Sequence, residues 1–117
     1  MNIESFRNFC LSRKGAKEDF PFDDNTMVFK VMGKMFALGD VQDFVSINLK
    51  VDPETGVELR ERYPSVLEGY HMNKKHWITV LMDGSVPDRY ICQWINNSYD
   101  LVVAGLTKSQ KSALDSR

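Results

Sequence analysis

Apolar and polar positions alternate along this chain with two periods, one typical of helices and the other of strands. Apolar residues recur at spacings of three and four behind Asn2, which predicts a capped helix over about Ile3–Arg13. Asp52 and Pro53 form a favourable helix start, so a second helix is expected from there to about Tyr63. These two patterns thus predict two amphipathic helices.

A third helical pattern lies near the end of the chain. Ser85 and Asp88 have the spacing of a capping box, and helix-spaced apolar residues continue from there to about Ala104. Gly105 is a plausible end for this helix. The following residues, 107–117, are polar, and we expect them to form a frayed tail.

Alternation with a period of two marks the strands. Five segments are predicted as strands: Met27–Val31, Met35–Leu38, Phe44–Lys50, Val66–Tyr70 and His76–Met82. Gly33 and Lys34 would turn the first hairpin, and Pro21 favours a loop before it. Strand alternation also turns Lys50 toward solvent.

These elements follow one another in the order α-β3-α-β2-α. Consecutive strands joined by short turns form antiparallel pairs, and helices outside the hairpins cover the resulting sheet. The sequence therefore predicts an α+β two-layer sandwich, with residues 1–106 as a single domain and 107–117 as a polar tail.

Composition agrees with one globular domain. The chain has 117 residues, of which 43% are hydrophobic and 26% charged. No apolar run approaches the ~20 residues that cross a bilayer, and no targeting signal is visible. Cys10 and Cys92 lie in apolar helical patterns and are predicted to be reduced core thiols, so a cytoplasmic location is expected.

A net charge of −1 requires any binding of nucleic acid to come from a local patch. The segment Gly69–Met82 contains no Asp or Glu and is the locally basic, aromatic stretch. We predict that five lysines contact phosphates: Lys30, Lys34, Lys50, Lys74 and Lys75. Three further residues are predicted to make shorter-range contacts: Asn73, His76 and Trp77. The alternative is a solvated two-lysine turn beside a tryptophan of the core.

The residues give little indication of metal binding, of a phosphate-binding loop or of catalysis. The spacing of His71 and His76 matches no metal-ligand motif, no glycine-rich phosphate loop is present, and no nucleophile has a neighbouring base. We therefore expect no metal, no cofactor and no enzymatic activity. A further hypothesis, an enzyme or small-ligand binder with a pocket lined by Tyr70, His71 and Asp100, stays open.

An ordered set of short segments spans nearly the whole chain, from about Ile3 to Leu106. The segments are Phe20–Asp23, Val28–Val31, Gly33–Phe36, Asn48–Lys50, Asp52–Pro53, Gly69–Trp77 and Ser98–Val102. Together they resemble the MmcQ/YjbR family. The resemblance implies an α-β3-α-β2-α sandwich akin to secretion-chaperone-like and frataxin-like domains, and it implies DNA binding as the function.

Two functional hypotheses follow. The first is a non-enzymatic domain that binds nucleic acid, DNA in particular, through the basic, aromatic residues. The second is a protein- or peptide-binding module of chaperone-like shape, which would use an exposed apolar patch or a sheet edge. Charge reversal at Lys74 and Lys75 separates them, because only nucleic-acid binding depends on those lysines.

Overall fold

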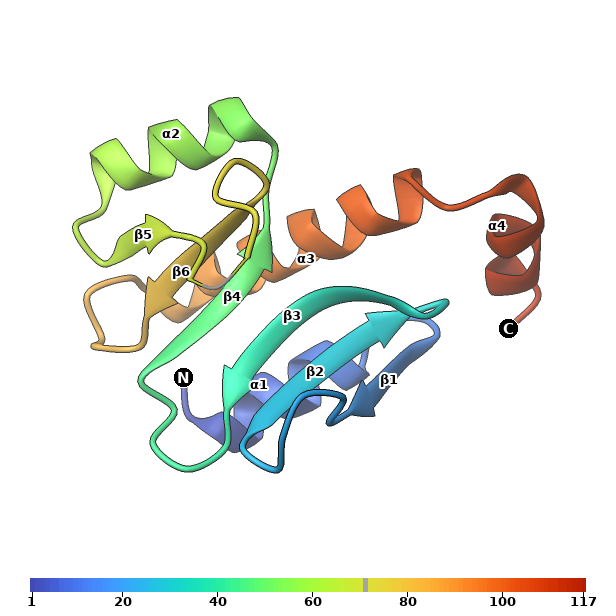
Figure 1. Cartoon of the computed structure of the whole chain (residues 1–117), viewed down its shortest axis with the longest axis horizontal. Helices are drawn as coiled ribbons and strands as arrows, with labels where there is room; N and C mark the ends of the chain where they lie inside the picture. Colours follow the sequence, from blue (N-terminus) through green and yellow to red (C-terminus); the bar gives the residue numbers. More distant parts are fainter. Residues whose placement is uncertain (71) are drawn as a thin grey trace.

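One antiparallel sheet of six strands organises the fold, and the computed structural model describes residues 1–70 and 72–117. The strands are β1 (Ala16–Asp19), β2 (Thr26–Val31), β3 (Lys34–Asp40), β4 (Ser46–Lys50), β5 (Val66–Glu68) and β6 (Trp77–Leu81). The helices are α1 (Ile3–Leu11), α2 (Pro53–Arg62), α3 (Asp88–Ala104) and α4 (Lys108–Asp115) (Figure 1). The strand order is β1-β2-β3-β4-β6-β5, so the predicted α+β class with an antiparallel sheet is confirmed.

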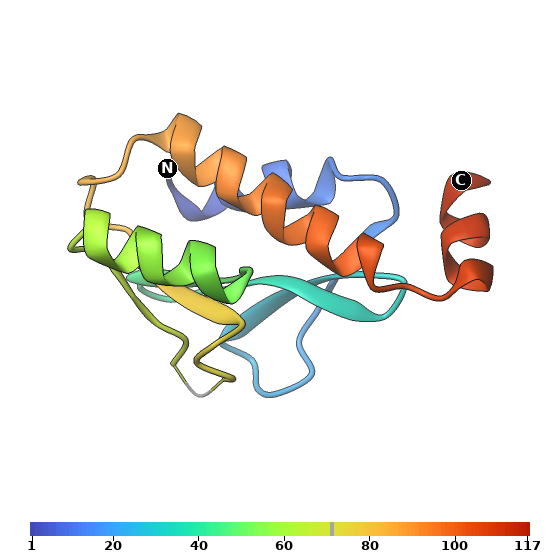
Figure 2. The ribbon, with the colours of Figure 1, turned by 90° about the horizontal axis from the view of Figure 1, so that it is seen from above.

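Helices α1, α2 and α3 cover one face of the sheet. Figure 2 shows these three helices on one side, while the connections β1–β2 and β5–β6 project from the other side. The core lies between the layers, where the Phe6 ring of α1 meets Phe29 at 5.5 Å and Phe44 at 5.3 Å between centroids. Burial of these apolar side chains is the main stabilising contribution, and it leaves the second face of the sheet without a helical cover.

Backbone conformation explains two of the strand boundaries. Met32 and Gly33 have φ values of 50° and 79°, as a two-residue hairpin turn of type I′ requires, so the turn lies one residue earlier than predicted. Phe44 has a φ of 46°, and β4 begins only at Ser46. The predicted third strand is therefore shorter at its start, and Val45 is exposed instead of buried.

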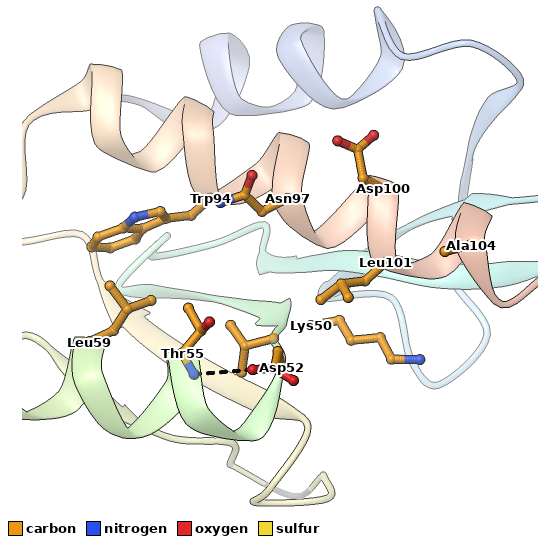
Figure 3. Close-up of a pocket in the computed structure, with 10 residues that line it drawn as sticks. Lys50, Asp52, Thr55, Leu59, Trp94, Asn97, Asp100, Leu101 and Ala104 are labelled. Atoms are coloured by element: carbon orange, nitrogen blue, oxygen red, sulfur yellow. Dashed lines mark hydrogen bonds between the residues drawn. The ribbon is translucent and has the colours of Figure 1, made fainter.

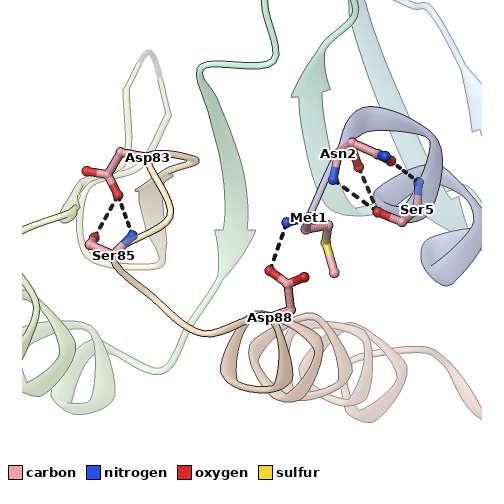
Figure 4. Close-up of polar contacts among 6 residues, drawn as sticks. All are labelled: Met1, Asn2, Ser5, Asp83, Ser85 and Asp88. Carbon is pink, nitrogen blue, oxygen red and sulfur yellow. Dashed lines mark hydrogen bonds and ion pairs between the residues drawn. The ribbon is translucent and has the colours of Figure 1, made fainter.

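Helix caps confirm two predictions and correct one. The Asn2 side chain accepts from the Ser5 N–H, and Asp52 accepts from the Thr55 N–H (Figure 4 shows the first pair). The predicted box at Ser85 is wrong, because α3 begins at Asp88 with no side-chain cap. Asp88 is paired with the N-terminal ammonium at 2.8 Å instead (Figure 4).

Two elements lie where no regular structure was predicted. β1 occupies part of the expected loop and pairs with β2 along its whole length. α4 replaces the expected frayed tail, with a capping box between Thr107 and Gln110. Leu114 of α4 is buried, so the tail is packed onto the domain. None of the helices in the described ranges is both long and apolar enough to span a bilayer.

Candidate functional site: the open face of the sheet

The uncovered face of the sheet, called the open face here, is formed by alternate residues of neighbouring strands. On the four central strands its members follow from the register: Thr26, Val28, Lys30, Met35, Leu38, Asp40, Ser46, Asn48, Lys50, Trp77 and Thr79. The outer strands add Lys17, Asp19 and Leu67. Val28, Leu38 and Trp77 form a small buried cluster on this face, with Met35 and Met72 packed against it. The open face thus has an apolar centre and polar surroundings.

Trp77 does not present its indole to solvent. Only 9% of the residue is exposed, because it packs in the cluster with Val28 and Leu38. Trp77 therefore has no exposed indole with which to make the shorter-range contact predicted for it. Lys75 is nevertheless exposed, since β6 begins at Trp77 and strand alternation does not extend back to the turn that contains Lys75.

Lys30 lies on the open face but already has a partner. Its Nζ is 3.0 Å from Asp19 Oδ2 across the β1–β2 pair, and its side chain is 25% exposed. The hydrogen bond from Lys30 holds the pKa of the Asp19 carboxyl below its usual value. The positive charge of Lys30, one of the five lysines predicted to contact phosphates, is thus compensated by the Asp19 carboxylate.

Lys34 and Lys50 border a hollow at the end of the open face. The hollow has a volume of about 250 Å³, and Trp77 and Gly105 line it as well. Lys34 is exposed beside the hairpin turn, and Lys50 is half-buried at the last position of β4. No ion pair is formed by either lysine with the part of the chain that the structure describes.

The connection between β5 and β6 holds the remaining predicted residues. Asn73 Oδ1 accepts from the backbone N–H of Lys75 at 2.9 Å and of His76 at 3.3 Å, so its carbonyl shapes the turn. Lys74, Lys75 and His76 are exposed. Lys74 Nζ is 3.9 Å from Glu68 Oε2, and 72% of the Lys74 side chain is exposed, so this pair compensates the charge only weakly.

The charges of the open face are separated along the strands. Lys34 begins β3 and Asp40 ends it. Lys50, at the end of β4, lies on the side of Lys34, and Thr26, at the start of β2, pairs with Asp40. The basic end comprises Lys34, Lys50, Lys74, Lys75 and His76. The acidic end comprises Asp23, Asp24, Asp40 and Asp43. Sequence reasoning noticed the lysines, but only the register shows that they share one end of the face.

A groove crosses the open face between the two projecting connections. Its volume is about 640 Å³, and strands β2, β3 and β4 form its floor. Phe22 comes from the β1–β2 connection and Tyr70 from the β5–β6 connection, with exposed fractions of 62% and 70%. The Tyr70 N–H donates to Thr79 Oγ1, whose hydroxyl donates to Asn48 Oδ1.

Sequence reasoning missed the groove residues Phe22, Asp40 and Asn48. The period-2 pattern of β4 could have placed Asn48 opposite the core, but the sequence does not show that this face is uncovered. Phe22 and Asp40 come from separate segments, and pairing of Thr26 with Asp40 brings them to one end of the sheet.

The predicted pocket of Tyr70, His71 and Asp100 is not formed as expected. Tyr70 lines the groove on the open face, whereas Asp100 belongs to α3 on the opposite side of the sheet. His71 lies outside the described residues. Asp100 borders a cleft of about 360 Å³ between α2 and α3, which Lys50 also lines. Figure 3 shows the Asp100 carboxylate directed away from Lys50 and Asp52.

The described residues contain no group of three or more His, Cys, Asp or Glu side chains placed to hold a metal ion. The cysteines do not form a reactive pair either. Burial raises the pKa of the Cys10 thiol strongly, and burial also raises the pKa of Cys92. Both cysteines are free.

Comparison with known proteins gives consistent matches. The family model named YjbR matches residues 11–101. Protein YbdF of Escherichia coli O157:H7 is 42% identical over 106 residues, which cover 90% of this chain and 87% of that protein. Protein YjbR of Escherichia coli K12 is 31% identical over 115 residues, which cover 97% of this chain and 98% of that protein.

Solved structures extend the similarity to three dimensions. A crystal structure of Deinococcus radiodurans protein DR2400, with family-model domain DUF419, has a TM-score of 0.89 at 45% identity. The match covers 97% of this chain and 88% of that chain. A crystal structure of a Pseudomonas syringae protein has a TM-score of 0.74 at 33% identity, covering 86% and 98% of the two chains.

Proposed function

The chain belongs to the YjbR family, and from that premise we propose that it is a non-enzymatic nucleic-acid-binding domain that contacts phosphates with the basic end of its open face. One observation carries the proposal: lysines from three separate segments, Lys34, Lys50 and the pair at 74–75, lie at one end of the open face. Ammonium groups in such an arrangement attract the phosphate backbone without reading the bases.

The proposal assigns different roles to the residues predicted from sequence. Lys34, Lys50, Lys74 and Lys75 contact phosphates, and His76 adds a hydrogen-bond donor at the same end. Lys30 contributes little because Asp19 compensates its charge. Asn73 supports the turn, and Trp77 stabilises the open-face cluster from within.

About four phosphate contacts give a modest affinity with a steep dependence on salt. For duplex DNA, release of condensed counterions predicts a slope of about −4 in log K against log salt. The acidic end of the same face repels the backbone, so a bound nucleic acid should lie across the basic end and avoid the groove.

Fluorescence anisotropy with labelled duplex and single-stranded DNA, at low and near-physiological salt, tests the proposal. Saturable binding that weakens steeply with salt is expected, and the variant Lys74→Glu/Lys75→Glu should lose it. The matched control is Lys108→Glu/Lys111→Glu, which makes the same charge change on exposed residues of α4. Absence of binding at low salt, or equal loss in both variants, would contradict a phosphate site at the basic end.

A second candidate, a peptide-binding module, is favoured by the groove. Exposed Phe22 and Tyr70 border it, and Asp23 and Asp40 line it, so its surroundings suit a cationic or apolar ligand better than a phosphate. A protein that binds no DNA but binds peptide in this groove would support the second candidate.

A further inference from the structure

The groove on the open face is the largest hollow described above that has exposed aromatic side chains at its border. Its volume of about 640 Å³ exceeds the 360 Å³ of the cleft between α2 and α3. A single small cation occupies far less space, whereas several side chains of an extended peptide fit a groove of this size.

The apolar part of the groove consists of Met35, Leu38 and Met72. Leu38 is 5% exposed and fixed in the open-face cluster, while the two methionines have flexible, polarisable side chains that adapt to different ligands. Phe22 and Tyr70 lie on the two connections that border the groove. This floor favours a ligand with apolar side chains.

Amide and hydroxyl groups lie beside the apolar floor. Asn48 Oδ1 accepts from the Thr79 hydroxyl at 2.8 Å, which fixes the side chain. Its amide nitrogen makes no hydrogen bond with the described residues, so two donors remain for a ligand carbonyl. Thr26 and Ser46 also line the groove and supply hydroxyls. These groups match the backbone of an extended chain.

Two carboxylates at one end of the groove have no cationic partner among the residues that the structure describes. Asp23 accepts from the N–H groups of Asn25 and Thr26, and Asp40 lies opposite Thr26 in the β2–β3 register. Within the described ranges, neither forms an ion pair, and no groove-lining residue is Lys or Arg. The two backbone N–H donors lower the pKa of Asp23, which keeps it anionic.

We propose that this groove binds an extended peptide segment that carries an arginine between apolar residues. The guanidinium pairs with Asp23 and Asp40, and the neighbouring apolar side chains cover Met35, Leu38 and Met72. Arginine fits better than lysine because its planar fork pairs with carboxylates and its face stacks on aromatic rings such as Phe22 and Tyr70. This inference rests on the peptide-binding candidate and does not require nucleic-acid binding.

The probe is a fluorescein-labelled, capped peptide Ser-Val-Leu-Arg-Leu-Val-Ser, compared with the same peptide containing neutral citrulline in place of arginine. Anisotropy measures affinity, and amide chemical shifts of the labelled protein locate the site. The arginine peptide should shift the amides of Thr26, Leu38 and Asn48. Citrulline should weaken binding about tenfold, as expected for loss of a charge-assisted hydrogen bond.

Protein variants make the test specific. Asp40→Asn should weaken binding of the arginine peptide by about tenfold, with a much smaller effect on the citrulline peptide. Asp43→Asn is the matched control, because Asp43 is exposed near the same end but does not line the groove. Lys74→Glu/Lys75→Glu should leave peptide binding intact, so failure of this inference is distinguishable from failure of the nucleic-acid proposal.

Several outcomes would overturn the inference. These are equal affinity for the arginine and citrulline peptides, shifts confined to amides outside the groove, and equal weakening by Asp40→Asn and Asp43→Asn. Amide chemical shifts of groove residues that change with protein concentration in the absence of peptide would mean that a second copy of this chain binds the groove. That result would also contradict the proposed binding of a peptide.

Discussion

The hydroxyl of Ser98 accepts a hydrogen bond from the backbone N–H of Lys50 at 2.8 Å. It also donates to the carbonyl of Phe36. Ala37 pairs with Leu49 in the β3–β4 register. The next pair would join Phe36 to Lys50, but the ladder ends before it. Ser98 of α3 thus replaces direct strand pairing where β3 and β4 separate, next to the basic end.

Substitution of Ser98 by Ala should destabilise the domain by about 1–3 kcal/mol, because backbone groups of Lys50 and Phe36 lose their partner in a fully buried position. Urea unfolding followed by circular dichroism measures this change. Ser112→Ala, on an exposed residue of α4, is the control and should have a far smaller effect. An unchanged midpoint for Ser98→Ala would show that water or direct strand pairing replaces the hydroxyl.

Gly69 should not tolerate even one added methyl group. A Cβ there would lie 2.8 Å from Trp77 Cβ and 2.9 Å from the Trp77 carbonyl oxygen, which is backbone and cannot move easily. We expect Gly69→Ala to cost about 1–3 kcal/mol in unfolding free energy. Gly105→Ala, whose Cβ would meet nothing closer than 3.6 Å, should be neutral or stabilising. Thermal unfolding of both variants tests this contrast.

The stability of α4 should depend on its cap. Thr107→Ala removes the side-chain acceptor for the Gln110 N–H and should weaken the helix by about 1 kcal/mol. Amide hydrogen exchange should accelerate in α4 and much less in α3, because the cap is local. Uniform acceleration across both helices would mean that α4 and the core open together.

Two carboxylates should make stability depend on acid pH. Hydrogen bonds from Ser85 lower the pKa of Asp83, and those from Asn25 and Thr26 lower the pKa of Asp23. A depressed folded-state pKa stabilises the protein above the unfolded value of about 3.9, and the contribution is lost as pH falls through the folded value.

The expected result is that wild type exceeds Asp83→Asn in stability at neutral pH and that the difference shrinks below about pH 3. Unfolding midpoints in urea across this range give the comparison. Asp24→Asn serves as the control, because the Asp24 carboxylate has no hydrogen bond to the described residues. A difference that is constant with pH would mean that charge is not involved.

The two thiols should differ in alkylation. Cys92 is partly exposed, while Cys10 is fully buried, and burial raises the pKa of the Cys10 thiol strongly. Because the thiolate is the reactive form, iodoacetamide should modify Cys92 slowly and Cys10 only after unfolding. Mass spectrometry of the native and urea-treated protein resolves the two sites, and equal labelling in the native state would contradict the buried placement of Cys10.

The sequence predicted most of the fold because periodic apolar residues mark the elements that make the core. β1 was missed since Lys17, Glu18 and Asp19 have no apolar alternation, and pairing with β2 makes the segment a strand. α4 was missed because it buries essentially one side chain, Leu114, in a polar segment. Both elements depend on tertiary contacts that periodicity does not contain.

The candidate site was less predictable than the fold. Lys74 and Lys75 are exposed as expected, but Trp77 is buried on a face that no helix covers, because the strand register places it beside Val28 and Leu38. Tyr70 and Asp100 lie on opposite sides because α3 packs on the other face. Local sequence reveals which residues are charged or aromatic, whereas strand register decides which of them meet.

Separation of charge along the strands also affects how partners arrive. β3 alone places Lys34 and Asp40 about 20 Å apart, so the open face carries an electric dipole parallel to its strands. A partner whose charge is unevenly distributed experiences a torque that orients it during diffusion, before any contact forms. Added salt shortens the reach of this field to about 8 Å at physiological strength, and should therefore slow association more than it speeds dissociation.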